Sequence, residues 1–141
     1  MIHDVSTDTD DPPRFVALRD IRLHCRNGVE YSGGRQCHAG IEPKIFKQSR
    51  DKIFHAALET ANALQWHIAA ATENEGRIEA TATTRLLRFK DDVVIRLRTE
   101  IDGTRVDIRS ASRVGSSDFG ANARRIRAFL SKINTRLKTN T

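Results

Sequence analysis

The residues best suited to chemistry lie between positions 109 and 126, which read RSASRVGSSDFGANARRI. Arginines, serines and a glycine come directly before an apolar helical pattern. Free backbone N–H groups at a helix start, a glycine that permits close approach and nearby cations together favour anion binding. One hypothesis is therefore a small-ligand or anion-binding site at the start of the C-terminal helix, formed by Arg109, Arg113, Ser117 and Asn122.

The same residues have a structural interpretation, which the sequence favours. Ser117 or Asp118 would cap the helix, and a carboxylate there would accept the free N–H groups and repel an incoming phosphate. Asp92 would pair with Arg113. Asp91 and Asp92 would not share a proton or an ion, because adjacent strand residues point to opposite faces. The structural network predicted here consists of Asp92, Arg113 and Asp118.

The serines of this stretch do not form a recognisable nucleophile. GSSDFG is not the Gly-x-Ser-x-Gly elbow of a hydrolase, and His55 and His67 belong to other elements. A serine nucleophile needs a base within hydrogen-bond reach. We therefore assign no catalytic residue and keep an enzyme only as the third class of function.

Cys25 and Cys37 each have a histidine neighbour, His24 and His38. Four zinc ligands are one interpretation, but zinc motifs usually separate paired ligands by two or more residues. A disulfide closing the glycine-rich loop in an oxidising compartment is a second. The favoured interpretation is two unpaired thiols, so no metal and no cofactor is predicted.

The net charge of +6 is confined to the C-terminal quarter of the chain, since residues 109 to 141 hold eight Lys and Arg but one acid. A solvated basic helix face explains this asymmetry. Nucleic-acid binding is disfavoured, because the outward positions of the predicted sheet carry no aromatic side chain for base stacking. No apolar run approaches the roughly 20 residues of a membrane-spanning helix, and residues 1 to 13 have neither the basic nor the apolar region that is typical of a signal peptide. We expect a soluble chain, cytoplasmic or part of a membrane-associated protein.

Apolar periodicity predicts an irregular N-terminal arm and loop over residues 1 to 40 and one α+β domain over residues 41 to 141. In chain order the predicted elements are a strand at 41–46, a helix at 49–64, strands at 66–70 and 77–83, a hairpin centred on 102–103 and a helix from about 118 to 137. The simplest architecture is an antiparallel sheet with two helices on one face. Its order, β-α-β-β-β-β-α, is that of the TATA-box-binding protein repeat.

Asp102 and Gly103 predict a two-residue type I′ turn with Ile101 opposite Thr104. This register places Arg98 opposite Asp107, Glu100 opposite Arg105 and Asp92 opposite Arg113. Opposite charges facing each other across a ladder support the register.

With these elements in place, the chain resembles the uncharacterised bacterial and plant family called domain of unknown function 1499. FKDDVVIRLR at 89–98 and the stretch at 109–126 carry the resemblance, and DPPRF, NGVEYSGG and IEP extend it over nearly the whole chain. The resemblance supports the fold but implies no activity. Many bacterial members place this domain after hydrophobic segments.

The favoured hypothesis is a non-enzymatic binding or assembly module for a protein or cell-envelope partner. It would use the charged sheet face or the grooves beside the N-terminal arm. The small-ligand or anion-binding site is the alternative. The sequence leaves the partner, the compartment and the oligomeric state open.

Overall fold

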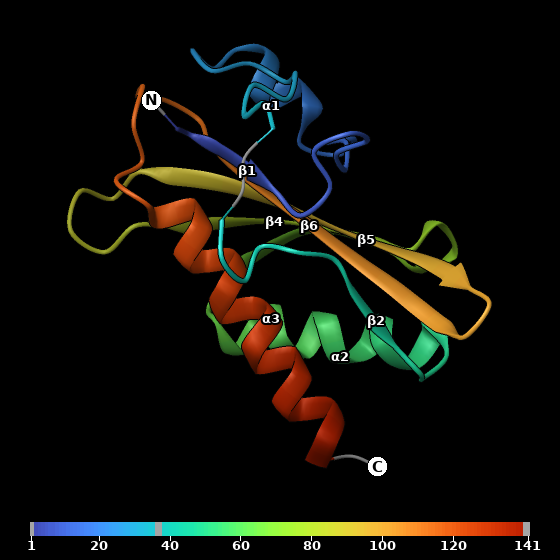
Figure 1. Cartoon of the computed structure of the whole chain (residues 1–141). Coiled ribbons are helices and arrows are strands. Elements are labelled where there is room, and N and C mark those ends of the chain that lie inside the picture. The colour runs from blue at the N-terminus through green and yellow to red at the C-terminus, as the bar shows by residue number, and fades with distance from the viewer. Residues whose placement is uncertain (1, 36–37, 140–141) are drawn as a thin grey trace.

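The computed structural model describes residues 2 to 35 and 38 to 139. It contains a six-stranded antiparallel sheet with helices packed against it (Figure 1). The elements are β1 (Asp4–Ser6), α1 (Arg19–Leu23), β2 (Lys44–Phe46), α2 (Arg50–Ala63), β3 (His67–Thr72), the short 3-10 helix η1 (Glu73–Glu75), β4 (Arg77–Thr83), β5 (Lys90–Glu100), β6 (Gly103–Ser112) and α3 (Ala121–Thr139). The predicted α+β class and antiparallel sheet are confirmed. The likeness of the strand order to the TATA-box-binding protein repeat is not confirmed.

β6 pairs with three strands, β5 on one side and both β1 and β2 on the other. The strand order is β1-β6-β5-β4-β3, and β2 also pairs with β6. β1 pairs with residues 109 to 111 of β6, and β2 pairs with residues 104 to 106, so two short strands share one edge. The predicted irregular arm thus contains a strand. On the opposite side of the sheet, β3 pairs with β4 in a register that shifts between Ile68 and Ala70.

Helices α2 and α3 cover one face of the sheet and form the main core with it (Figure 1). The apolar residues of both helices recur at the spacing of one helical stripe, which places them against the sheet. Trp66 stacks on Phe129 of α3 with ring centroids 5.7 Å apart. Among the described residues, no helix is both long enough and apolar enough to cross a membrane.

The register of the β5–β6 hairpin differs by two residues from the predicted one. Arg98 lies opposite Arg105 and not opposite Asp107, whose partner is Arg96. Because side chains alternate with a period of two, this shift keeps every residue on its predicted face and changes only its partner.

The cause of the shift lies outside the hairpin. Gly103 has a φ of +149°, and a Cβ at this position would collide with the carbonyl oxygen of Phe46. Gly103 therefore permits the close approach of β2, and the turn is made by Ile101 and Asp102. The sequence around the turn contains no sign of this contact.

The second face of the sheet is covered by the N-terminal segment, residues 8 to 35, which lies opposite α2 and α3 (Figure 1). Phe15 and Leu18 of this segment pack on Val94 and Ala111 of the sheet. Polar side chains fill the rest of this layer, and Glu79, Asp92, Asp107 and Arg109 are each at most 2% exposed. The charged sheet face, which the sequence offers as a surface for a partner, is thus covered by the N-terminal segment.

Candidate functional site

Arg109 points from β6 into the layer beneath the N-terminal segment. Its guanidinium donates to both carboxylate oxygens of Asp4 at 3.0 and 2.9 Å, and to the carbonyls of Pro13 and Val29 at 3.1 and 3.0 Å. It also lies 4.7 Å from the ring centroid of Phe15. Through these contacts Arg109 connects β6 with β1 and the N-terminal segment.

Glu79 of β4 holds the same segment from the other side. Its carboxylate accepts the backbone N–H groups of Val16, Ala17 and Leu18 at 2.9, 2.7 and 3.1 Å. Glu79 is fully buried, and Arg77 Nε donates to it at 3.3 Å. A carboxylate of the protein therefore takes the place that an external anion would occupy above these three N–H groups.

Arg113 and Asp92 are paired, and the pair has a third member. Asp92 is fully buried and accepts hydrogen bonds from Arg113 Nε and Nη2, both at 2.9 Å, and from Arg22 Nη1 at 3.0 Å. Thr81 Oγ1 donates to it at 2.8 Å. The hydrogen bonds that Arg113 donates to Asp92 are the largest influence on the pKa of Arg113, which is raised.

Asp118 occupies the start of α3. Its carboxylate accepts the backbone N–H groups of Gly120 and Asn122 at 2.7 and 3.3 Å and the side-chain amide of Asn122 at 2.8 Å. Asn122 is fully buried and also bonds to Ser110 and Ser112 at 2.6 and 2.9 Å. Ser117 Oγ accepts only a long bond, 3.4 Å, from the backbone of Phe119.

The four residues of the predicted anion site therefore do not converge. Arg109 and Arg113 project into the layer under the N-terminal segment, where they pair with Asp4 and Asp92. Asn122 projects into the layer of α3. No set of donors among these described residues points at a common position.

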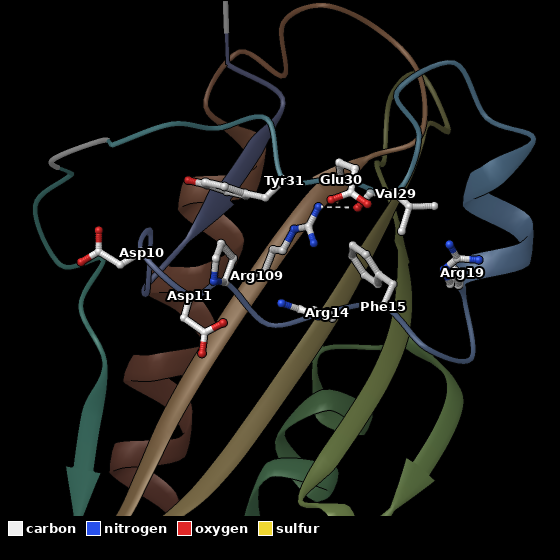
Figure 2. A pocket seen from close by; sticks show the side chains of 10 residues that line it. Asp10, Asp11, Arg14, Phe15, Arg19, Val29, Glu30, Tyr31 and Arg109 are labelled. Carbon is white, nitrogen blue, oxygen red and sulfur yellow. Dashed lines mark hydrogen bonds between the residues drawn. The ribbon is translucent and has the colours of Figure 1, made fainter.

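A pocket of about 400 Å³ opens between parts of the N-terminal segment, with Arg109 of β6 in its lining (Figure 2). Arg109 lies between Tyr31 and Phe15 there. Burial raises the pKa of Tyr31 to about 12, with a further contribution from Asp4 and an opposing one from Arg109. Tyr31 therefore stays protonated at neutral pH, and its hydroxyl donates to the carbonyl of Gly34 at 2.8 Å. This side chain does not supply a base for catalysis.

The described part of the chain has no group of three or more His, Cys, Asp or Glu side chains able to hold an ion. Cys25 Sγ donates to the carbonyl of Ile21 at 3.3 Å. Cys37 lies outside the described residues, so the predicted alternatives for the two thiols stay predictions.

Two loops lie at the end of the sheet opposite the β5–β6 turn (Figure 1). Both carry exposed apolar side chains. They are the β4–β5 loop, residues 84 to 89, and the β6–α3 loop, residues 113 to 120; we call them together the loop tip. Its large apolar side chains are Leu86, Leu87, Phe89, Val114 and Phe119, exposed by 90%, 61%, 47%, 44% and 83%. All five line one hollow of about 290 Å³, which shows that the two loops adjoin.

The β4–β5 loop is closed by hydrogen bonds at its base. Thr84 N donates to the carbonyl of Phe89 at 2.8 Å, and the hydroxyl of Thr84 accepts the N–H of Phe89, also at 2.8 Å. Arg88 N donates to the carbonyl of Thr84 at 3.1 Å. These hydrogen bonds within the loop hold the backbone that carries Leu86 and Leu87.

Phe119 is held in an unusual conformation beside this loop. Its φ is +52°, a left-handed value that costs a residue with a side chain roughly 1–2 kcal/mol. Arg124 Nη1 donates to its carbonyl at 3.0 Å. The sequence predicts a helix from about residue 118, which would include Phe119. That expectation is wrong, because α3 begins at Ala121 and the side chain of Phe119 is exposed.

Asp91 lies at the floor of the loop tip and is 1% exposed. Burial raises its pKa above the ordinary value, and Arg125 and the hydroxyl of Ser112 oppose the rise. Arg125 Nη1 lies 2.8 Å from Asp91 Oδ2. As the alternation of the strand predicts, Asp91 and Asp92 face opposite layers and do not form a pair.

Sequence reasoning missed the parts of the molecule that depend on the N-terminal segment and the loop tip. Nothing local marks Arg22 or Glu79 as buried, since the cover lies more than 60 positions away in the sequence. The loop tip did have a signal. Leu86 and Leu87 are adjacent, lie between two predicted strands and are flanked by arginines, so they cannot both face the core.

The chain matches the model of a family described as "Protein of unknown function (DUF1499)" over residues 4–133, and it belongs to that family. The family predicted from the sequence motifs is therefore confirmed. A search of curated proteins finds no match. Among solved structures, the chain is similar to a protein from Thermus thermophilus known from its crystal structure, with 11% identity and a TM-score of 0.41. The similarity covers 70% of this chain and 96% of that one.

Proposed function

We propose that this domain of unknown function 1499 protein is a non-enzymatic docking module that binds a protein or cell-envelope component through its loop tip. The observation that carries the proposal is the gathering of five large apolar side chains, 44% to 90% exposed, around one hollow. Isolated exposed apolar residues are ordinary, whereas contiguous ones mark interaction sites.

The bonding of the polar residues supports a non-enzymatic role. A general acid or base must come within hydrogen-bond reach of a substrate. Asp92 is enclosed by two arginines and a threonine, and Asp118 is engaged with the first turn of α3. These groups stabilise the fold and would have to give up those partners to act on a substrate.

The alternative, an anion site at the start of α3, has less support. An anion would have to displace Asp118 from the helix start and draw Arg113 away from Asp92. The first exchange would take from Asp118 the N–H groups that it accepts, and the second would remove charged hydrogen bonds from the buried Asp92. Weakening the ion pair of a buried carboxylate is costly. The loop tip needs no such rearrangement in order to bind.

Photo-crosslinking in intact cells tests the proposal. A photoreactive residue at position 87 or 119 should give covalent adducts, whereas the same residue at position 101 should not. Ile101 is the matched control, because it is a fully exposed apolar residue at the opposite end of the hairpin. Equal labelling at positions 87, 119 and 101, or no labelling at any of them, would contradict a docking role for the loop tip.

A further inference from the structure

We infer that the loop tip docks on an anionic lipid surface, with its apolar side chains in the interfacial layer and its basic side chains among the lipid headgroups. The inference rests on the proposed function and gives its partner a chemical class. It follows from the charge, the residue order and the backbone of the tip, which the next paragraphs take in turn.

The charge around the apolar side chains has one sign. Arg85, Arg88, Lys90 and Arg124 are exposed beside them. The two carboxylates nearby do not offset this charge at the surface. Asp91 is 1% exposed and paired with Arg125, and Asp118 caps α3. Basic residues near an anionic bilayer contribute roughly 1 kcal/mol each to its binding.

The order of residues favours a bilayer over a protein. The β4–β5 loop reads Arg85-Leu-Leu-Arg-Phe-Lys90, so basic and apolar side chains are interleaved within six positions. A protein interface separates a central apolar core from a polar rim, and an interleaved order cannot make this separation. At a bilayer, long basic side chains extend towards the headgroups while adjacent apolar side chains enter the boundary with the acyl chains.

The backbone of the loop tip is suited to the interfacial layer of a bilayer. Unpaired backbone groups are costly away from water. The base of the β4–β5 loop is closed through Thr84, and the carbonyl of Phe119 accepts a bond from Arg124. Phe119 also keeps a strained left-handed conformation that turns its ring outwards, and such strain is concentrated at functional positions.

Tryptophan fluorescence with lipid vesicles provides the direct test. The chain has one tryptophan, Trp66, which is 8% exposed and serves as a constant background. Phe119→Trp places a reporter on the tip, and Ile101→Trp places one at the opposite end. Brominated phosphatidylglycerol mixed with phosphatidylcholine should quench the Phe119→Trp emission and leave that of Ile101→Trp unchanged. Vesicles of brominated phosphatidylcholine alone should quench neither.

Vesicle flotation of the unlabelled chain separates the two contributions. Leu86→Ser with Leu87→Ser should weaken binding about tenfold or more, since each exposed leucine loses its apolar burial. Arg85→Glu with Arg88→Glu should also weaken it about tenfold or more, and high salt should weaken wild-type binding. The matched controls are Ile101→Ser for the apolar pair and Lys47→Glu with Lys52→Glu for the basic pair. A far-ultraviolet spectrum and a melting curve confirm that each variant is folded.

The lipid inference is overturned if folded wild-type protein does not float with anionic vesicles, or if the control variants lose as much binding as the tip variants. If the protein does not bind vesicles but position 87 crosslinks to a protein, the lipid partner is overturned and the docking role is retained. Failure of both experiments would overturn both proposals.

Discussion

Arg113 and Asp92 are joined by a two-pronged ion pair that runs diagonally across the β5–β6 ladder. Arg113 Nε and Nη2 lie 2.9 Å from the two carboxylate oxygens of Asp92, whose direct ladder partner is Ala111. The pairing had been expected from a register in which the two residues face each other. Flexible arginine side chains thus produce the expected contact from a different register.

Arg113→Ala should lower the free energy of unfolding by about 1–3 kcal/mol, because it removes charged hydrogen bonds from a buried carboxylate. Arg22 still donates to that carboxylate, which keeps the loss moderate. Urea denaturation measures the change, with the exposed Lys132→Ala as the control. Equal stability of the Arg113 variant and wild type would show that this arginine is not structural and would reopen the anion-binding hypothesis.

Glu79→Gln should loosen the N-terminal segment. The amide that replaces one carboxylate oxygen presents donors where backbone N–H groups of residues 16 to 18 now donate. Hydrogen exchange at these three amides should become at least tenfold faster, which corresponds to roughly 1.4 kcal/mol or more. Glu75→Gln is the control, since Glu75 is exposed and also lies beside Arg77. Unchanged exchange in the Glu79 variant would mean that other contacts hold the segment.

Asp91→Asn should change how stability depends on pH. Burial raises the pKa of Asp91 in the folded state above 3.8, so the folded state binds the proton more tightly than the unfolded state. Wild type should therefore lose stability relative to the variant as pH rises from about 3.8 through the raised pKa. Arg125 keeps hydrogen bonds to Ser110 and Asn122 in the variant.

Urea denaturation of both proteins between pH 4 and pH 7, roughly the range over which carboxyl groups of raised pKa ionise, gives this difference directly. If wild type instead gained stability over the variant with rising pH, the pair with Arg125 would outweigh burial.

Phe119→Gly should stabilise the fold while abolishing docking. Glycine adopts the left-handed conformation without strain, so the free energy of unfolding should rise by about 0.5–1 kcal/mol. The ring makes few contacts to lose, being 83% exposed. Melting temperature and vesicle flotation should thus move in opposite directions. Phe119→Ala keeps the strain and removes the ring, so it should lose docking without the gain in stability.

The sequence could predict what depends on local periodicity. The helix predicted at 49–64 is α2, in which Ile53, Ala57 and Ala61 form one buried stripe. The strand predicted at 77–83 is β4, in which Glu79 and Thr81 lie on one face. Such patterns need no knowledge of distant residues.

What depends on contacts between distant segments could not be predicted. The hairpin register is set by Phe46 against Gly103, and the burial of Glu79 is set by residues 16 to 18. The start of α3 was misplaced for a local reason. Gly120, with a φ of +83°, follows Phe119 in a left-handed pair that delays the helix until Ala121. Phenylalanine rarely adopts a left-handed conformation, so the residue type did not indicate that the helix would begin after it.

The pairing of β6 with both β1 and β2 bears on how copies of this chain behave at high concentration. An unpaired strand edge is a template for sheet growth from one molecule to the next. Here one margin of the sheet consists of two short strands, β1 and β2, and β3 at the other margin has an irregular register between Ile68 and Ala70. An irregularity of this kind increases the local twist of the strand and disrupts the hydrogen-bond ladder. We therefore expect neither margin to pair readily with the sheet of another molecule, which disfavours fibre-like aggregation.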